Sequence, residues 1–290
     1  MHGAGSKRVV VNADDFGFSP GITEGILRAH REGIVTSTTL AANLPDAERA
    51  AARLAEAPGL GVGVHLNACQ GPPLSQAGEA LAETDGLMRF TATGLILACL
   101  RRPALVDAVE AEFDAQIRRV LEWGVRPTHL DSHRHSHAWP PIFRRVVRLA
   151  RTYGITCVRR VREVLPPGPW PAASAKQRAV ARLLNAFDAV NAAACGGASG
   201  GARVWATTGT WGIAYTGRIG AAFLAQAAHA VRAGTTEIMV HPGLDLGDLP
   251  PGVTTRLRAC REAEMAALCD PAVRGAFQVA GVELTHYGRL

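Results

Sequence analysis

Two adjacent carboxylates, Asp14 and Asp15, come shortly after an apolar run at residues 9–11. Such a run is typical of a buried strand, so the pair is expected at the carboxyl end of that strand. Imidazoles that could work with these carboxylates occur at His65 and within residues 129–137. Carboxylates and imidazoles brought together from separate strand ends are common donors of a hydrolytic metal site.

Metal-assisted hydrolysis needs about three protein donors and one open position, where the pKa of a bound water falls from 15.7 toward ~7. Asp15, His65 and His133 can supply the donors. A separate base must take the proton of the water, and an acid must protonate a departing amine. Asp14 is the candidate base. His241, which follows another apolar run, is the candidate acid, or else it orients the substrate through a hydrogen bond.

The two carboxylates can share one site only under a structural condition. Side chains alternate along a strand, so Asp14 and Asp15 would point to opposite faces unless the strand breaks there. The following Phe16-Gly17 allows such a break. In the alternative interpretation, Asp14 caps the turn and His65 is an ordinary strand residue.

The histidine-rich segment needs only one of its imidazoles to complete the ligand set. Its chain cannot stay extended for long, because Trp139-Pro140-Pro141 is expected to open a helix. We therefore expect His135 and His137 on a loop, where they hydrogen-bond or line the pocket. Either of them is also an alternative to His133 as the ligand. Asp131 is expected to orient an imidazole or the candidate acid rather than bind the metal.

Positioning these groups requires a fold that gathers strand ends. Strand-like and helix-like patterns alternate along the chain, which implies parallel strands joined by right-handed crossovers, with functional groups at their carboxyl ends. After the first strand, we expect strands at 35–40, 60–66, 128–132, 155–160, 237–240 and 282–285. Helices are expected at 20–31, 46–56, 104–123, 141–153, 219–232 and 254–269. These patterns predict one α/β domain over residues 1–290.

Residues 162–203 interrupt this alternation and are expected to form an insertion bounded by Pro-rich and Gly-rich loops. Inside it, apolar residues recur at helical spacing, and basic residues are available for a polar side. The apolar residues are Val180, Leu183, Leu184, Phe187 and Val190, and the basic ones are Lys176, Arg178 and Arg182. One interpretation is an amphipathic helix packed on the body. The other is a lid or a lipid-binding groove, since a basic amphipathic helix can also rest on a membrane.

The bulk composition restricts the class of partner. The chain has 48% hydrophobic and 19% charged residues, as a globular protein does, and its net charge of +6 comes mostly from dispersed arginine. Nucleic-acid binding is therefore not expected. Six cysteines without a paired spacing, and no apolar stretch of membrane-spanning length, predict a cytoplasmic protein. Any membrane contact would be peripheral, at the inner face, and the oligomeric state is left open.

Five short motifs follow one another along the chain, at residues 12–17, 33–39, 65–67, 128–135 and 241–242. Together they resemble the YdjC family of carbohydrate deacetylases, which is similar in mechanism and in its distorted (β/α) barrel to the wider polysaccharide deacetylases. The resemblance covers residues 8 to about 160 well and returns at 237–243. It implies hydrolysis of the acetamide of an N-acetylated amino sugar, with release of acetate.

The resemblance also implies roles for individual residues. Asp15, His65 and His133 would bind one divalent metal ion, Asp14 would be the base and His241 the acid. Four further residues are expected near the ligands or the substrate, namely Asn67, Asp131, His135 and His137. The mixed donors suit Zn²⁺, whereas Mg²⁺ is often assigned to the family.

Residues 203–212 bear on the choice of substrate. They look more like the branch associated with hopanoid biosynthesis, which implies an N-acetylglucosaminyl hopanoid glycolipid. Soluble chito-oligosaccharides are the alternative within the family. Outside it, a metal phosphoesterase would typically need two bridged metals and more carboxylates, and a non-catalytic glycolipid-binding protein would not need Asp14.

Overall fold

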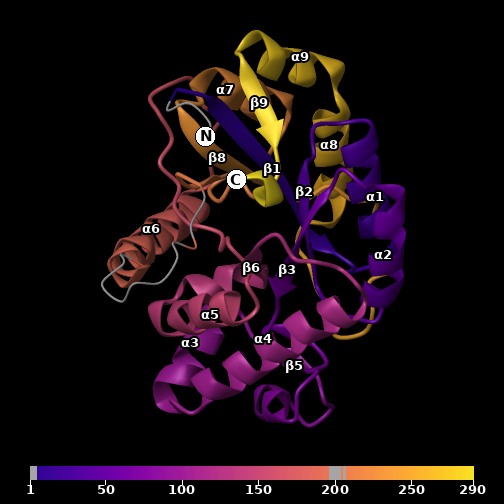
Figure 1. Ribbon diagram of the computed structural model, residues 1–290, viewed down its shortest axis with the longest axis vertical. Coiled ribbons are helices and arrows are strands. Elements are labelled where there is room, and N and C mark those ends of the chain that lie inside the picture. The colour runs from indigo at the N-terminus through magenta and orange to yellow at the C-terminus, as the bar shows by residue number, and fades with distance from the viewer. Residues whose placement is uncertain (1–4, 196–203, 205–206) are drawn as a thin grey trace.

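A curled parallel sheet forms the centre of the molecule, with helices around it (Figure 1). The computed structural model describes residues 5–195, 204 and 207–290. The strands follow the order β6-β3-β2-β1-β8-β7, and β9 also pairs with β1. Their bounds are β1 (Lys7–Phe16), β2 (Ser37–Leu40), β3 (Gly61–Leu66), β6 (Leu130–Ser132), β7 (Thr210–Trp211), β8 (Gly234–Val240) and β9 (Val282–Thr285). The expected α/β fold with a distorted, barrel-like parallel sheet is confirmed.

β1 is central because both of its edges are paired. On one edge it pairs with β8 from Lys7 to Ala13. On the other edge it pairs first with β9, over Lys7–Val10, and then with β2 from Asn12 onward. Its residues from Val9 onward are buried, as the continuous apolar run predicts for a parallel strand covered on both faces.

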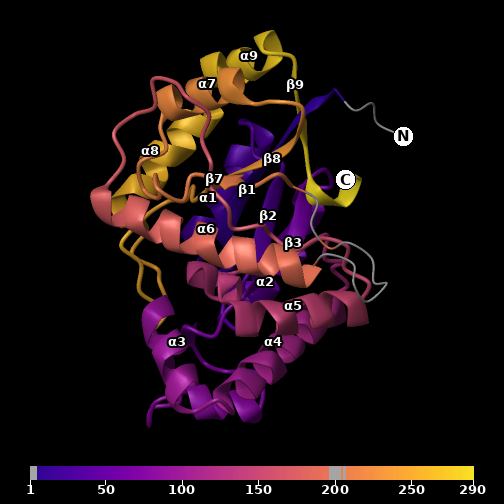
Figure 2. The same cartoon turned by 90° about the vertical axis from the view of Figure 1, so that its left-hand side faces the viewer.

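Helices surround the sheet on several sides (Figures 1 and 2). Their bounds are α1 (Pro20–Arg31), α2 (Ala47–Arg53), α3 (Ala92–Arg101), α4 (Leu105–Glu122), α5 (Pro140–Thr152), α6 (Ala175–Cys195), α7 (Ala221–Ala230), α8 (Arg258–Cys269) and α9 (Pro271–Val279). Four 3-10 turns are η1 (Leu54–Glu56), η2 (Ala77–Leu81), η3 (His133–Ala138) and η4 (Tyr287–Arg289). No helix in the described part of the chain has the length and apolarity that crossing a bilayer requires.

The strand expected at 155–160 is not a regular strand, and that prediction is wrong. The segment makes one isolated bridge to β6, between Leu130 and Val158. On its other edge Val158 donates its N–H to the Val204 carbonyl, and a tight contact from the Arg162 N–H to the Arg160 carbonyl turns the chain (2.8 Å). Because the pairing with β6 is limited to this one bridge, no continuous ladder forms. The segment nevertheless lies between β6 and β7.

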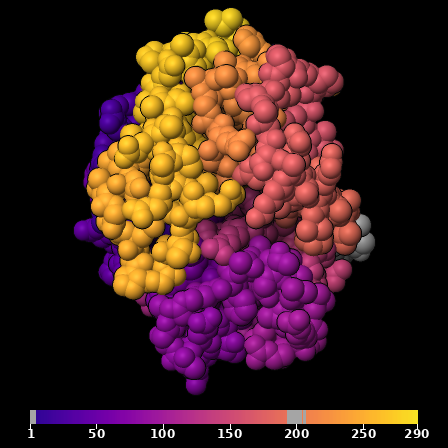
Figure 3. All heavy atoms as spheres, turned by 180° about the vertical axis from the view of Figure 1, so that it is seen from behind, coloured from indigo at the N-terminus to yellow at the C-terminus, as the bar shows by residue number. Residues whose placement is uncertain are grey.

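Several elements differ from the expected pattern. Helices α3 and α9 and a small hairpin of β4 (Gln70–Gly71) with β5 (Met88–Arg89) were not expected. Helix α8 begins at Arg258 rather than at residue 254, and the Thr254 N–H before it donates to the Gln70 side chain (2.9 Å). Seen from behind, the yellow-orange chain before α8 meets the purple part around β5 (Figure 3). A Cβ on Gly252 would lie 2.6 Å from Leu87, so this contact is close.

Helix α6 exists as expected, and of its expected apolar face Leu184 and Phe187 pack on the body. The side chains it buries are Gln177, Ala181, Leu184, Asp188 and Asn191. Val180, Leu183 and Val190, which were expected to pack, are exposed. The packed face is largely polar because it hydrogen-bonds the body: the side chain of Gln177 donates to the Thr216 carbonyl, and that of Asn191 donates to the Ala138 carbonyl. Residues 196–203, the end of the expected insertion, lie outside the described residues.

Candidate active site

The regular pairing of β1 breaks at Asp14 and Asp15, as the shared site requires, although the strand itself continues to Phe16. Asp15 has a φ of 73°, in the left-handed region, and Gly17 follows with a φ of 84°. The pairing of β1 with β2 shifts register between Ala13 and Phe16. A bulge of this kind redirects side chains, so the strict alternation of the strand does not hold at the pair.

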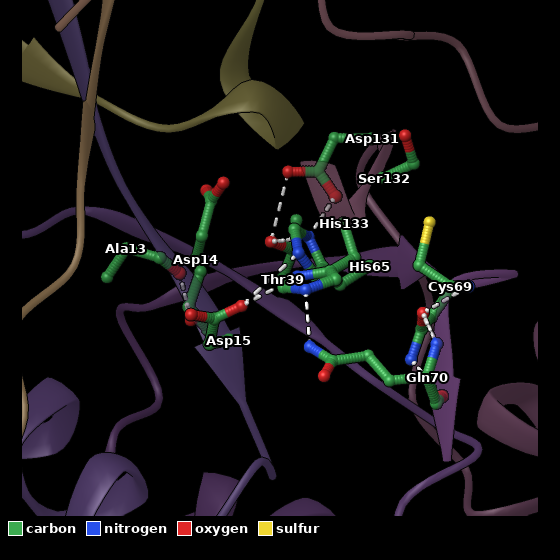
Figure 4. Close-up of polar contacts among 12 residues, drawn as sticks. Ala13, Asp14, Asp15, Thr39, His65, Cys69, Gln70, Asp131, Ser132 and His133 are labelled. Carbon is green, nitrogen blue, oxygen red and sulfur yellow. Dashed lines mark hydrogen bonds and ion pairs between the residues drawn. The ribbon is translucent and has the colours of Figure 1, made fainter. Parts of the chain in front are cut away.

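Asp15, His65 and His133 come together at the carboxyl ends of β1, β3 and β6 (Figure 4). The Asp15 Oδ1 atom lies 3.4 Å from His65 Nε2 and 3.3 Å from His133 Nδ1. Ligand atoms of the three residues all lie within 4.8 Å of one another. One carboxylate and two imidazoles that converge in a largely buried position fit a divalent metal ion.

Asp131 holds His65 from the side opposite Asp15. His65 Nδ1 lies 2.8 Å from one Asp131 oxygen, and the Thr39 hydroxyl donates to the other oxygen (3.1 Å). An imidazole held by a carboxylate at one nitrogen directs its second nitrogen at a metal, as is common in zinc sites. Burial opposes a charge on His65, but the Asp131 carboxylate outweighs it and raises the pKa of His65 to about 10.

The loop after β3 reaches the third candidate ligand. Gln70 Nε2 lies 2.6 Å from His133 Nε2. Asn67 shapes this loop, because its side chain accepts from the N–H groups of Cys69 and Gln70 and donates to the Gln70 carbonyl. The Asn67 backbone is in turn held by Gln116 of α4. Asn67 therefore lies behind the site and positions Gln70.

Asp14 is held by an arginine that the sequence analysis did not single out. The Arg159 guanidinium forms two bonds to Asp14, of 2.8 and 2.6 Å, and further ion pairs of 2.7 Å to Asp131 and to Glu237. Burial favours the neutral acid, but the charge and the hydrogen bonds of Arg159, together with the His65 charge, outweigh it and lower the pKa of Asp14. Asn12 donates a third bond to Asp14 (2.9 Å). The sequence offered one signal that could have identified Arg159, namely the position of this charged residue inside a strand expected to be buried.

Two side chains of α8 were also missed. Arg261 contacts the second oxygen of Asp15, and Glu264 accepts the His241 backbone N–H (2.6 Å). Both are fully buried, and they sit three residues apart on one face of α8. Burial favours the neutral form of Asp15, but the Arg261 charge and the contacts with His133 and His65 together outweigh it and hold the pKa well below the usual value.

His241 lies at the end of β8 and is nearly buried. Its Nδ1 atom has no hydrogen-bond partner among the described residues. Burial lowers the pKa of His241 to about 4, although Asp14 and Asp15 oppose this effect. The imidazole is therefore neutral near pH 7 in this state.

His135 and His137 sit on η3, as the loop expectation required. Arg134 and His135 have φ values of 56° and 54°, so the chain turns sharply after His133. His137 is buried between the Ser132 hydroxyl (2.6 Å) and the Arg159 carbonyl (3.2 Å), which gives it a structural contact. His135 Nδ1 is buried without a partner among the described residues.

A second group of possible metal ligands, Asp14, His65 and Asp131, overlaps the first. Arg159 already binds both of these carboxylates, so its positive charge would oppose a cation there. The set of Asp15, His65 and His133 is the better candidate.

The fold and this site define an α/β barrel-like protein whose strand ends hold a buried carboxylate–imidazole cluster. The model of the YdjC-like protein family matches residues 8–279. The chain therefore belongs to the YdjC-like family.

Curated relatives match about half of the chain. A carbohydrate deacetylase of Halalkalibacterium halodurans is 42% identical over 148 residues, which cover 51% of this chain and 62% of the relative. One of Geobacillus stearothermophilus is 42% identical over 157 residues, covering 54% of this chain and 61% of that protein. The chain thus spans less than two thirds of these relatives.

A solved structure supports the fold over nearly the whole chain. It belongs to an Enterococcus faecalis protein named for cellobiose-phosphate cleavage, with a TM-score of 0.76 at 23% identity. The match covers 98% of each chain. At this identity the likeness concerns the fold alone.

Proposed function

We propose that this protein is a metal-dependent carbohydrate N-deacetylase, which hydrolyses the acetamide of an N-acetylated amino sugar and releases acetate. The observation that carries the proposal is the convergence of Asp15, His65 and His133 beside a separate carboxylate, Asp14. Family membership and the names of the deacetylase relatives agree with it.

Asp15, His65 and His133 would hold one divalent ion, Zn²⁺ or Mg²⁺. When bound, such an ion polarises an amide carbonyl and lowers the pKa of water. Asp131 would keep Nε2 of His65 directed at the ion, and Gln70 would hold His133. These supports limit the motion of the ligands, as a preorganised site requires.

Asp14 would act as the base. It remains ionised because Arg159 lowers its pKa, and two bonds from the same guanidinium fix its orientation. A base so strongly paired is weak in itself, so it needs an acidic proton to remove, which metal-bound water would supply.

His241 would face the departing amine. Because it is neutral near pH 7, it acts as an acid only after it gains a proton during the reaction, or it orients the substrate through a hydrogen bond. Its unpaired Nδ1 leaves either role available. His135, with a buried unpaired nitrogen on η3, would contact the sugar.

The substrate we propose is an N-acetylglucosaminyl glycolipid of the hopanoid type, handled at the inner face of the membrane in the cytoplasm. Soluble chito-oligosaccharides are the alternative. The exposed apolar residues of α6 favour a lipid-linked substrate.

Acetate release tests the reaction. The purified protein, loaded in turn with Zn²⁺ and Mg²⁺, is offered N-acetylglucosaminyl lipids, chito-oligosaccharides and sugar phosphates. We expect acetate from an N-acetylated substrate and none after chelation of the metal. Phosphate release without acetate would instead establish a phosphoesterase. If the metal-loaded protein binds the glycolipid but does not hydrolyse it, the protein would be a glycolipid-binding protein.

A further inference from the structure

Helix α6 carries three distinct strips of side chains. The first is the buried strip that attaches it to the body. A second strip, Val180, Leu183 and Val190, is exposed by 44%, 52% and 49%, and these residues recur along one side of the helix. Arg178 and Arg182, one turn apart, form an exposed third strip.

The charge on the exposed part of α6 has one sign. Lys176, Arg178 and Arg182 form no ion pair with another described residue. Asp188, the acidic residue of this helix, is buried and pairs with Arg160. The exposed surface of α6 therefore combines apolar side chains with cations and presents no carboxylate.

Helix α3 repeats this combination. Leu97 and Leu100 are exposed by 44% and 62%, and Arg101 and Arg102 follow them at the surface. Residues 92–102 contain no acidic residue. Five of the ten large apolar residues that the described chain exposes belong to these two helices.

Both helices adjoin the loop that carries His133. The side chain of Asn191, on α6, donates to the Ala138 carbonyl at the end of η3 (2.8 Å). Arg134, on η3, donates to the Phe90 carbonyl just before α3 (2.7 Å). Figure 2 shows α6 and α3 on the same side of the molecule, with α6 above α3. The two helices thus flank η3.

We propose that the exposed surface of α3 and α6 is a docking surface for an anionic lipid membrane. Apolar side chains beside cations, on helices without exposed acids, match a bilayer interface in which headgroups are negative and acyl chains lie just below. A second copy of the chain is disfavoured as the occupant, because both copies would bring cations to the contact. The inference concerns a partner and does not depend on the proposed reaction.

Binding to lipid vesicles tests this surface. The purified protein is mixed with vesicles of phosphatidylcholine, with or without phosphatidylglycerol, and the bound fraction is measured by flotation. We expect binding to the anionic vesicles, little binding to the neutral ones, and release when salt rises from about 0.15 M to 1 M, which shortens electrostatic range from ~8 to ~3 Å.

Variants separate charge from insertion. Arg178→Ala with Arg182→Ala should weaken the partition coefficient roughly 30-fold, at about 1 kcal/mol for each cation. Leu100→Gln with Leu183→Gln should weaken it about tenfold, from the loss of partly buried apolar area. A matched control is Arg126→Ala with Arg232→Ala, two exposed cations near the amino ends of β6 and β8 that form no ion pair with described residues.

Each outcome decides for or against the surface. Loss of binding in the two surface variants, with the control unchanged and circular dichroism unaltered, supports it. Equal binding to neutral vesicles, equal loss in the control, or no effect of the leucine changes overturns it. Sedimentation velocity that shows a dimer, dissociated by the leucine changes, would assign the surface to a second copy instead. Because acetate release is not measured, the result stands apart from the proposed function.

Discussion

At the scale of single residues, backbone conformation gives two neighbouring aspartates different surroundings. Asp15 adopts a left-handed φ, and its oxygens face His65, His133 and Arg261. Asp14, one residue earlier, is turned to Arg159 instead. The same residue type is therefore expected to bind the metal at one position and to act as a base at the other.

Exchange of each aspartate for asparagine tests this division. Asp14→Asn should keep the metal yet lose turnover by about 10² or more, the usual effect of a general base. Asp15→Asn should lose the metal as well. Asparagine suits position 15 because it tolerates a positive φ better than most residues, so the backbone is preserved. Elemental analysis of the purified variants decides, and equal metal loss in both would contradict the assignment.

Glu264 predicts a pH dependence of stability. Burial raises its pKa from 4.5 to about 8, so the folded state binds a proton that the unfolded state releases between these two values. Stability is therefore lost as the pH rises from about 4.5 to about 8, and Glu264→Gln should recover it. The gain in the free energy of unfolding from Glu264→Gln should be near zero at about pH 4.5 and on the order of 1–4 kcal/mol at about pH 8.

Urea unfolding of the wild type and Glu264→Gln at several pH values measures this gain. Glutamine can still accept the His241 N–H, so the bond to β8 remains available. Glu262→Gln on the same helix, an exposed position, is the matched control and should show no such trend. A constant difference across the pH range would show that Glu264 is ionised in the folded protein.

At the scale of elements, an irregular segment positions Arg159, a central residue of the site. The chain at 155–162 bridges β6 on one side, and on the other side its Arg162 carbonyl accepts from Thr210 in β7 (2.8 Å). This position brings Arg159 inside the sheet, fully buried among three carboxylates. Glu237, one of the three, is also held by Tyr287 of η4 (2.7 Å).

Removal of this arginine should cost much stability. Arg159→Met leaves Asp14, Asp131 and Glu237 buried without their shared cation, and we expect a loss of about 3–5 kcal/mol. Arg159→Lys keeps the charge but not the planar fork, so its loss should be smaller. Arg232→Met, at an exposed site, should stay within about 0.5 kcal/mol. Chemical unfolding measures all three, and a stable Met variant would contradict the central role of Arg159.

At the scale of the whole molecule, the candidate ligands come from three separate strands. Asp15 lies near the carboxyl end of β1, His65 lies in β3 and His133 opens η3 after β6. An ion bound to all three would link these strands. Since a ligand that binds only the folded state stabilises it, metal should raise the melting temperature.

Chelation tests this link. At a metal concentration about 100 times its dissociation constant, binding adds ~2.7 kcal/mol, and its removal should lower the melting temperature by roughly 5–10 °C. Differential scanning fluorimetry with Zn²⁺, Mg²⁺ and chelator measures the shift. Asp15→Asn should show no shift with any ion, and a wild type that behaves like this variant would argue against the metal site.

Much of the fold could be predicted because its signals are local. Apolar runs marked the strands, and the Ser19-Pro20 start of α1 follows from capping, with the Ser19 hydroxyl accepting the Ile22 N–H. The segment at 155–160 was mistaken for a strand because an apolar pattern reports burial, whereas a strand also needs a continuous partner. The packed face of α6 was predicted only in part, because Gln177, Asp188 and Asn191 are polar and their partners are distant in sequence.

The sequence by itself determined which groups this protein has for chemistry and that they lie at strand ends, because residue type and hydrophobic period are local properties. It also determined that β1 must break at Asp14 and Asp15. Only the tertiary structure decided that Arg159 and Arg261 hold these two carboxylates, since each bond joins residues more than a hundred positions apart. Which cation pairs with a buried carboxylate depends on proximity in three dimensions, and no local sequence pattern indicates it.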